Sequence, residues 1–269
     1  MQLIDTTEDR RASTDRRAPD HARTEAELLA AIEEDQIEVL FQPQFSSADN
    51  RLVGAEALAR WHHPVRGRIG VGALFELAEC TGRVQQLSRH VVGKALAAAV
   101  EWPVPLRLSL NVTAADVAAG NFADTVMAAL AEAGFPPEHL VLEITEQVLV
   151  TDLAGSAVQL GKLADLGVGI ALDDFGAGFC NFHYLKRLPL QFLKLDRSMI
   201  DGIAQDPRDL AVLRGIVTMA RALGLEVCAE GIEREEQRAV IAREGCASWQ
   251  GFLGAVPMSA GDFAALAGL

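Results

Sequence analysis

Apolar and polar positions change their spacing many times along the chain, and the changes predict alternating helices and strands. From Thr24, "TEAELLAAIEED" has apolar residues at helical spacing and a threonine placed to cap the helix. Short apolar runs then alternate with helical stretches to the end of the chain. The predicted strands are "IEVLFQP", "LVGAEAL", "LRLSLNV", "LVLEIT", "VGIALDD", "FLKLD", "EVCAEG" and "SWQGFLG". The predicted helices include residues 84–100, 122–133, 156–166, 208–223 and 234–244.

The number and order of these elements predict an α/β fold. Eight strands with intervening helices are typical of a TIM-like (β/α)8 barrel. The link between the first two strands is an exception, because only "SSADNR", residues 46–51, joins them. A parallel crossover needs a dozen residues or more. We therefore expect a barrel with an antiparallel first strand.

Composition favours a globular protein of the cytoplasm. Half of the residues are hydrophobic and 23% are charged, which is ample material for a core. No apolar run is long enough to span a bilayer, and the first 21 residues lack the apolar centre of a signal peptide, so membrane insertion is not expected. The four cysteines show no CxxC spacing, which indicates free thiols in a reducing compartment.

The formal net charge of −13 restricts the partners. A nucleic-acid polymer needs a basic surface, so we do not expect one to bind. A small phosphate ester is compatible with this charge if divalent cations stand between it and the protein. We interpret residues 1–23 as a polar, disordered tail and residues 24–269 as one folded domain. A phosphate-binding arm at "RRASTDRR" is the less favoured alternative for the tail.

Two adjacent acids at the end of a predicted core strand need an explanation. In "VGIALDDFGAGF", residues 168–179, an apolar run leads into Asp173 and Asp174. Regular strand geometry points two successive side chains to opposite faces. A buried carboxylate costs free energy unless it is paired or bound to a metal. These aspartates are therefore candidates for a functional site.

Every other predicted strand also carries a polar residue of a kind that can bind metal or substrate. A lone acid at a strand end is typically a helix cap or a salt-bridge partner. Seven consecutive strands with such residues favour a shared site, because the carboxyl ends of barrel strands converge on one mouth. In chain order the residues are Gln42, Glu56, Asn111, Glu143, Asp173 with Asp174, Lys194, Glu230 and Gln250.

The residue types in this set indicate the chemistry. Five carboxylates with an amide and a lysine suit Mg²⁺ or Mn²⁺, and the lack of histidine and cysteine disfavours structural zinc. Adjacent Asp173 and Asp174 suit two metals about 3.5–4 Å apart, with one carboxylate bridging. Lys194 could orient an attacking water, accept its proton or stabilise developing phosphate charge. The leading chemistry is metal-dependent phosphodiester hydrolysis.

The ordered motifs resemble those of EAL domains, the family of cyclic diguanylate (c-di-GMP) phosphodiesterases. The resemblance covers about residues 24–266 and implies a TIM-like barrel with an antiparallel first strand. It also implies that one phosphodiester of c-di-GMP is opened to give linear pGpG, and that the protein is a homodimer coupled to loop 175–182. The motifs are "FQPQF", "EALARW", "LSLNVT", "LEITE", "DDFGAGF", "LKLDRSMI", "AEGIE" and "QGF".

The resemblance further implies a role for each matching residue. The metal ligands are Glu56, Asn111, Glu143, Asp173, which bridges the two ions, and Asp174, on the second ion. The catalytic residues are Lys194, near the attacking water, Glu230, tied to the metal site, and Gln250, near the nucleophile. The substrate-binding residues are Gln42 and Arg60, the latter through a phosphate oxygen. Glu146 matches a glutamate that anchors the loop after the paired aspartates, although an acid here could instead open a short helix.

Two departures from the family pattern affect these expectations. The family loop usually reads "DDFGTGYSSL", whereas here Ala177, Cys180 and Asn181 replace hydroxyl residues. "GFLGAVPM" also lacks the usual "F-S/A-K/R-P", which concerns the guanine pocket. Neither departure removes a ligand, so an enzyme is favoured. The alternative is a catalytically weak or inactive c-di-GMP receptor that acts through protein contacts.

Overall fold

A computed structural model describes residues 22–146, 152–178 and 182–268 of the chain, which divide into two compact units. The smaller unit contains residues 22–38 and 59–91 among those described. The larger unit contains residues 39–58 and 92–268. The strand-end residues predicted to form the site all belong to the larger unit.

The smaller unit consists mainly of helices beside a short antiparallel pair of strands. A helix covers residues 22–33, and residues 61–63 pair antiparallel with residues 67–69. The other elements that lie wholly or partly in it include β2 (Leu52–His63), β3 (Gly67–Ile69), α2 (Val71–Thr81) and α3 (Val84–Ala99), and β1 (Ile37–Ser46) begins in it.

One expectation for this unit was wrong. Residues 22 and 23 are already helical, so Thr24 does not cap the first helix. Arg23 Nε donates to Glu27 Oε1 at 2.9 Å, one turn further on, which favours this earlier helical turn. Strand β3 leads through Gly70 directly into α2.

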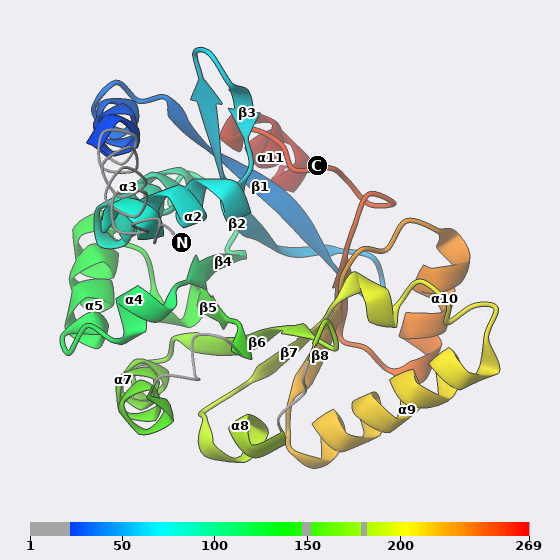
Figure 1. The fold of residues 1–269 in the computed structure, drawn as a ribbon. Coiled ribbons are helices and arrows are strands. Elements are labelled where there is room, and N and C mark those ends of the chain that lie inside the picture. Colours follow the sequence, from blue (N-terminus) through cyan, green and yellow to red (C-terminus); the bar gives the residue numbers. More distant parts are fainter. Residues whose placement is uncertain (1–21, 147–151, 179–181, 269) are drawn as a thin grey trace, which may run out of the picture. The chain divides into compact units, whose positions relative to one another are not determined.

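The larger unit is a closed barrel of eight strands, shown in Figure 1. In the barrel, β2 and β4 to β9 run parallel to their neighbours in this series, whereas β1 pairs antiparallel with β9. The pairing of β1 with β2 closes the ring, and in their hairpin the Ser46 N–H donates to the Arg51 carbonyl at 2.8 Å. The antiparallel first strand is therefore confirmed. The remaining strands are β1 (Ile37–Ser46), β4 (Arg107–Val112), β5 (Leu140–Ile144), β6 (Gly169–Phe175), β7 (Phe192–Leu195), β8 (Glu226–Ala229) and β9 (Ser248–Gln250).

Helices follow most of the parallel strands and lie outside them (Figure 1). The α-helices described with both ends in this unit, besides the end of α3, include α4 (Ala114–Val117), α5 (Phe122–Ala133), α7 (Leu153–Asp165), α8 (Phe182–Arg187), α9 (Pro207–Ala222), α10 (Glu235–Glu244) and α11 (Ala260–Ala267). Two 3-10 turns are η1 (Pro137–His139) and η2 (Arg197–Met199). Helix α7 begins three residues before its predicted start because the Asp152 side chain caps it, accepting from the Gly155 N–H at 2.9 Å.

An aromatic cluster fixes the reversed strand to the last helix. The rings of Phe41 on β1 and Trp102 lie 5.7 Å apart, and Phe263 on α11 lies 4.7 Å from Trp102. All three side chains are buried. Burial of one such ring contributes roughly 1.5–3 kcal/mol, so this cluster holds α11 against the barrel wall.

Two further expectations concern membranes and thiols. Among the described residues, no helix is both long enough and apolar enough to cross a membrane. Cys80, Cys228 and Cys246 are free cysteines, as their spacing predicted, and Cys180 lies outside the described residues.

Glu244, the last residue of α10, links this helix to α9. Its carboxylate accepts from Arg214 Nε at 2.8 Å and from Arg214 Nη2 at 3.0 Å, and Arg243 Nε donates to it at 3.0 Å. The hydrogen bonds from Arg214 are the main cause that lowers the pKa of Glu244 to about 2. Glu244 is therefore ionised in the folded protein even at mildly acidic pH.

We expect Glu244→Gln to lower the free energy of unfolding by about 1–2 kcal/mol at pH 7. A depressed pKa stabilises the fold above the unfolded pKa near 4.5, and this stabilisation is lost as the pH falls toward 2. The difference between wild type and variant, measured by urea unfolding, should therefore shrink between about pH 4.5 and pH 2. Glu236→Gln, on an exposed position of the same helix, is the control. A difference that is constant over this pH range would contradict the assignment.

Candidate active site

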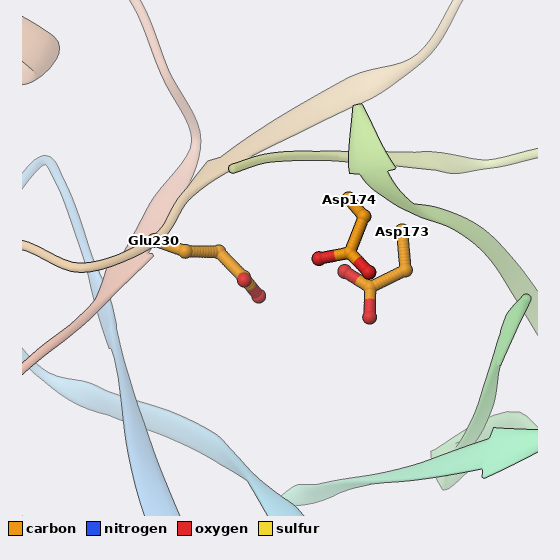
Figure 2. Close-up of side chains that lie close together, drawn as sticks. All are labelled: Asp173, Asp174 and Glu230. Atoms are coloured by element: carbon orange, nitrogen blue, oxygen red, sulfur yellow. The ribbon is translucent and has the colours of Figure 1, made fainter. Parts of the chain in front are cut away.

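The two adjacent aspartates of β6 face the same space, contrary to the expectation from regular strand geometry. Asp173 is a buried strand residue, whereas Asp174 has φ 54° in the left-handed region. The pairing of β6 with β7 shifts register between Leu172 and Phe175, which indicates a β-bulge. Aspartate tolerates the left-handed region better than most residues. The bulge turns the second side chain, and Figure 2 shows the two carboxylates next to each other.

Glu230 approaches these aspartates from the end of β8, two strands along the barrel from β6. It follows directly after β8, and its carboxylate points toward the other two in Figure 2. One oxygen from each of Asp173, Asp174 and Glu230 lies within 4.8 Å of the others. Asp173 Oδ1 is buried, and its one described polar contact is the Lys194 ammonium at 3.1 Å, without hydrogen-bond geometry. An all-oxygen donor set with a buried acceptor of this kind fits a hard divalent cation.

Lys194 lies at the centre of the acidic residues. Its side chain is buried, and its Nζ lies 2.7 Å from Glu230 Oε1, 3.1 Å from Asp173 Oδ1 and 3.4 Å from Glu56 Oε2. It also forms an ion pair with Glu143. One ammonium group therefore joins carboxylates that come from four different strands or strand ends.

Two amides complete the hydrogen bonding of Glu56. Asn111 Nδ2 donates to Glu56 Oε1 at 2.8 Å, and Gln250 Nε2 donates to Glu56 Oε2 at 2.7 Å. Gln250 Nε2 also donates to Glu230 Oε1 at 3.0 Å. Glu56, Asn111, Glu143, Asp173, Asp174, Lys194, Glu230 and Gln250 thus form one cluster in space, as their positions at strand ends predicted.

The cluster carries more negative than positive charge. Its five carboxylates and one ammonium leave four formal negative charges when all are ionised. Burial raises the pKa of Glu143 well above its usual range and the pKa of Glu230 to about 8. Burial and the neighbouring Asp173 also raise the pKa of Asp174. Bound protons therefore relieve part of the repulsion, and divalent cations would relieve it more completely.

Glu56 and Lys194 differ from Glu143, Asp174 and Glu230 because each is stabilised in its charged form. Burial alone would raise the pKa of Glu56, but Lys194 and the two amides lower it below its usual value. Burial would lower the pKa of Lys194, but the surrounding carboxylates raise it well above its usual value. Lys194 is therefore protonated in this arrangement. A protonated amine can orient a water or stabilise phosphate charge. It cannot accept the proton of the attacking water, which was the third role suggested by the sequence.

A pocket of about 280 Å³ adjoins the cluster. It is close to the lower end of the range for small-ligand sites, so it would enclose only part of a large ligand. Gln42, which was predicted to contact substrate, lines it and donates to the Ala255 carbonyl at 3.4 Å. The other residues that line it are Glu56, Leu58, Asp196, Arg197, Glu230, Gly231, Glu233, Gln250, Gly251 and Phe252.

Several of these pocket residues were not predicted from the sequence. Arg197 Nη1 donates to Glu233 Oε1 at 2.6 Å, and Arg197 Nη2 donates to Glu233 Oε2 at 3.2 Å. Asp196 and Phe252 line the same pocket as this pair, and Phe252 is 61% exposed. Asp196 directly follows β7, and Glu233 follows Glu230 by three residues. The positions of Asp196 and Glu233 just beyond strand ends could have identified them as candidate site residues from the sequence.

Comparison with known proteins identifies the family. The sequence model described as "EAL domain" matches residues 25–257. The chain belongs to the EAL domain family. This EAL domain is 38% identical over 238 residues to the "bifunctional diguanylate cyclase/cyclic di-GMP phosphodiesterase MucR" of Pseudomonas aeruginosa, covering 87% of this chain and 35% of MucR. It is 36% identical over 246 residues to the "cyclic di-GMP phosphodiesterase NbdA" of the same species, covering 90% of this chain and 31% of NbdA.

The chain thus spans about a third of the length of these curated relatives. Among solved structures, the "PaMucR phosphodiesterase, c-di-GMP complex" is similar with a TM-score of 0.82 and 37% identity, covering 90% of this EAL domain and 99% of that chain. The EAL enzyme Bd1971, in its cAMP- and cyclic-di-GMP-bound form, has a TM-score of 0.85 and 26% identity, covering 96% of this EAL domain and 72% of that chain.

Two residues with expected roles stay outside the described cluster of this EAL domain. Arg60 belongs to the smaller unit, where its Nη1 donates to the Ala59 carbonyl at 2.9 Å, and its contact with substrate remains a prediction. Glu146 is helical, but residues 147–151 and 179–181 lie outside the described residues. Its role as a loop anchor therefore remains a prediction, as do the effects of Cys180 and Asn181.

Proposed function

We propose that this EAL domain is a metal-dependent phosphodiesterase that hydrolyses c-di-GMP to linear pGpG. The observation that carries the proposal is the convergence of five carboxylates around Lys194 beside a pocket at the barrel mouth. The names of the relatives and the c-di-GMP complex of a similar structure support the choice of substrate.

The cofactors in this proposal are two divalent cations, Mg²⁺ or Mn²⁺. Glu56, Asn111, Glu143, Asp173 and Asp174 would hold them, with Glu230 close by. Two divalent cations carry four positive charges, which matches the four formal negative charges of the cluster. When bound, such cations lower the pKa of a coordinated water and stabilise charge on phosphate oxygens.

Side chains of the domain would bind the substrate and orient the reacting groups. The protonated Nζ of Lys194 donates toward oxygens around it, so it would hold a water or a phosphate oxygen by a charge-assisted hydrogen bond. Gln250 orients Glu56 and Glu230 through its amide N–H groups. Gln42, in the pocket wall, and Arg60 are proposed to contact the dinucleotide.

The proposal is tested by incubating the purified chain with c-di-GMP in Mg²⁺ or Mn²⁺ and separating the products by liquid chromatography. We expect linear pGpG to accumulate, and we expect none after EDTA treatment. Calorimetric binding of c-di-GMP without any product would support the receptor alternative and contradict hydrolysis.

We expect Ca²⁺ to occupy the site yet support little or no turnover, and so to inhibit in competition with Mg²⁺. Ca²⁺ binds oxygens at about 2.3–2.6 Å in flexible geometry, whereas Mg²⁺ requires a near-octahedral shell at about 2.0–2.1 Å. The measurement is the initial rate at fixed Mg²⁺ with increasing Ca²⁺. Comparable rates in Ca²⁺ alone and Mg²⁺ alone would contradict this expectation.

A homodimer coupled to loop 175–182 is part of the same proposal and rests on the family resemblance. The cytoplasmic location and the lack of binding to nucleic-acid polymers likewise remain predictions.

A further inference from the structure

The second glutamine of "FQPQF" has no role in the site described above, yet it lies directly beneath it. Gln44 is buried on β1, with 7% of its surface exposed. In the antiparallel pairing of β1 with β9, Gln44 is the direct partner of Gln250. Side chains of directly opposed residues project to the same face of a sheet, so these two amides are neighbours.

The two amides are joined by a hydrogen bond with a defined direction. Gln44 Nε2 donates to Gln250 Oε1 at 3.0 Å. Gln250 Nε2, at the other end of the same amide, donates to Glu56 Oε2 and Glu230 Oε1. The oxygen of Gln250 therefore faces Gln44, and its NH₂ group faces the two carboxylates.

This direction matters because a glutamine amide can rotate by half a turn with little change in shape. In the reversed orientation the oxygen of Gln250 would face two carboxylates, and both would lose a buried hydrogen bond. An unsatisfied buried acceptor costs about 1–3 kcal/mol. Gln44 disfavours this reversal, since its own NH₂ group needs the oxygen of Gln250 as an acceptor.

The barrel wall leaves room for Gln44 at a neighbouring glycine. A Cβ added at Gly54 on β2 would lie 3.2 Å from Gln44 Oε1 and 2.6 Å from the Arg107 carbonyl oxygen. Gln44 Nε2 also lies 3.5 Å from Ser109 Oγ on β4, a much longer contact than the one with Gln250. Gln44 is thus confined on two sides and directed toward Gln250.

We propose that Gln44 is a positioning residue that fixes the orientation of the Gln250 amide and, through it, the carboxylates of Glu56 and Glu230. Gln44 does not line the pocket. Gln44 contacts Gln250, and Gln250 contacts the carboxylates, so Gln44 would act on them indirectly. The effect on turnover rests on the proposed hydrolysis, whereas the effect on the Gln250 amide does not.

Two substitutions of similar size test the proposal. Gln44→Leu removes the donor, and Gln44→Glu replaces it with an acceptor that attracts the NH₂ group of Gln250 and so favours the reversed amide. We expect kcat for c-di-GMP to fall about 10–100-fold in both variants, the range typical for residues that orient metal-site groups. Ser109→Ala removes the other partner of Gln44 and is the control, with kcat expected within about twofold of wild type.

A double-mutant cycle separates positioning from general packing. If Gln44 acts through Gln250, Gln44→Leu should cause no further loss of kcat in a Gln250→Ala background. A role limited to filling the barrel would reduce kcat by the same factor in both backgrounds, and this outcome would overturn the proposal.

A spectroscopic readout makes the test independent of activity. The side-chain NH₂ signals of Gln250 can be assigned in ¹H–¹⁵N spectra by their absence from Gln250→Ala. We expect these signals to shift or broaden in Gln44→Leu and to stay in place in Ser109→Ala. Unchanged signals in Gln44→Leu would overturn the proposal even if kcat falls. If the wild type hydrolyses no c-di-GMP, the proposed function fails, and these spectra still decide the role of Gln44.

Discussion

Replacing Glu56 by alanine is expected to abolish c-di-GMP hydrolysis, with a loss of more than about 10²-fold. The change removes one anionic metal ligand of the proposed site. It also leaves the amide of Asn111 and the buried amide of Gln250 without their shared acceptor and removes one partner of Lys194. The measurements are the rate of pGpG formation in Mg²⁺ and the affinity for Mn²⁺ by calorimetry.

Two control variants distinguish the loss of a metal ligand from a general loss of stability. Glu56→Gln keeps the shape of the side chain and removes only its charge, so it should be nearly as inactive. Glu226→Ala also removes a glutamate from a barrel strand, but at the exposed start of β8, and should keep near-normal turnover. Near-normal turnover of Glu56→Ala in Mg²⁺ would refute the assignment of Glu56 as a ligand.

Replacing Lys194 by alanine is expected to lower turnover by about 10²–10⁴-fold while c-di-GMP binding changes little. The amine is buried among carboxylates and protonated, so it is placed to hold a water or a phosphate oxygen during the reaction. In the proposal the cations and Arg60 supply most of the attraction for the phosphates in the ground state. Binding can be measured by calorimetry in Ca²⁺, where turnover is expected to be slow.

Comparing the losses of affinity and of rate in the Lys194 variant tests this role. If affinity and rate fall by the same factor, Lys194 contributes mainly to binding. Lys162→Ala, on an exposed position of α7, controls for the loss of a lysine elsewhere in the barrel. Thermal unfolding with and without Mg²⁺ should show a destabilised variant that the cation restores, because removing Lys194 leaves the carboxylates without their common counter-ion.

The architecture was readable from the sequence because it depends on chain connectivity. Only residues 46–51 join the first two strands, and so short a link permits a hairpin but no parallel crossover. The remaining strands are separated by helix-length segments, which fixes them as parallel. The gathering of Glu56, Glu143 and Lys194 followed from the same argument, since parallel strands end at the same mouth.

The parts that could not be predicted depend on local deviations from regular geometry. The bulge that turns Asp174 beside Asp173 leaves no periodic signal, so alternation suggested opposite faces. The short helices α4 and α8 span only 4 and 6 residues, too few for a helical pattern to emerge. The pair of Arg197 and Glu233 depends on how two strand-end loops approach each other, which spacing along the chain does not show.

The position of β1 between β2 and β9 sets the order in which the molecule can assemble. The hairpin with β2 is local and can form within microseconds, but the pairing of Gln44 with Gln250 joins residues 206 positions apart. Until β9 docks, β1 keeps an open edge that can pair with another chain and aggregate. Gln250, on β9, then has no contact with Glu56, on β2. Hydrolytic competence would therefore arise at the last closure of the ring, and a nascent chain released before residue 248 would be both inactive and vulnerable to aggregation.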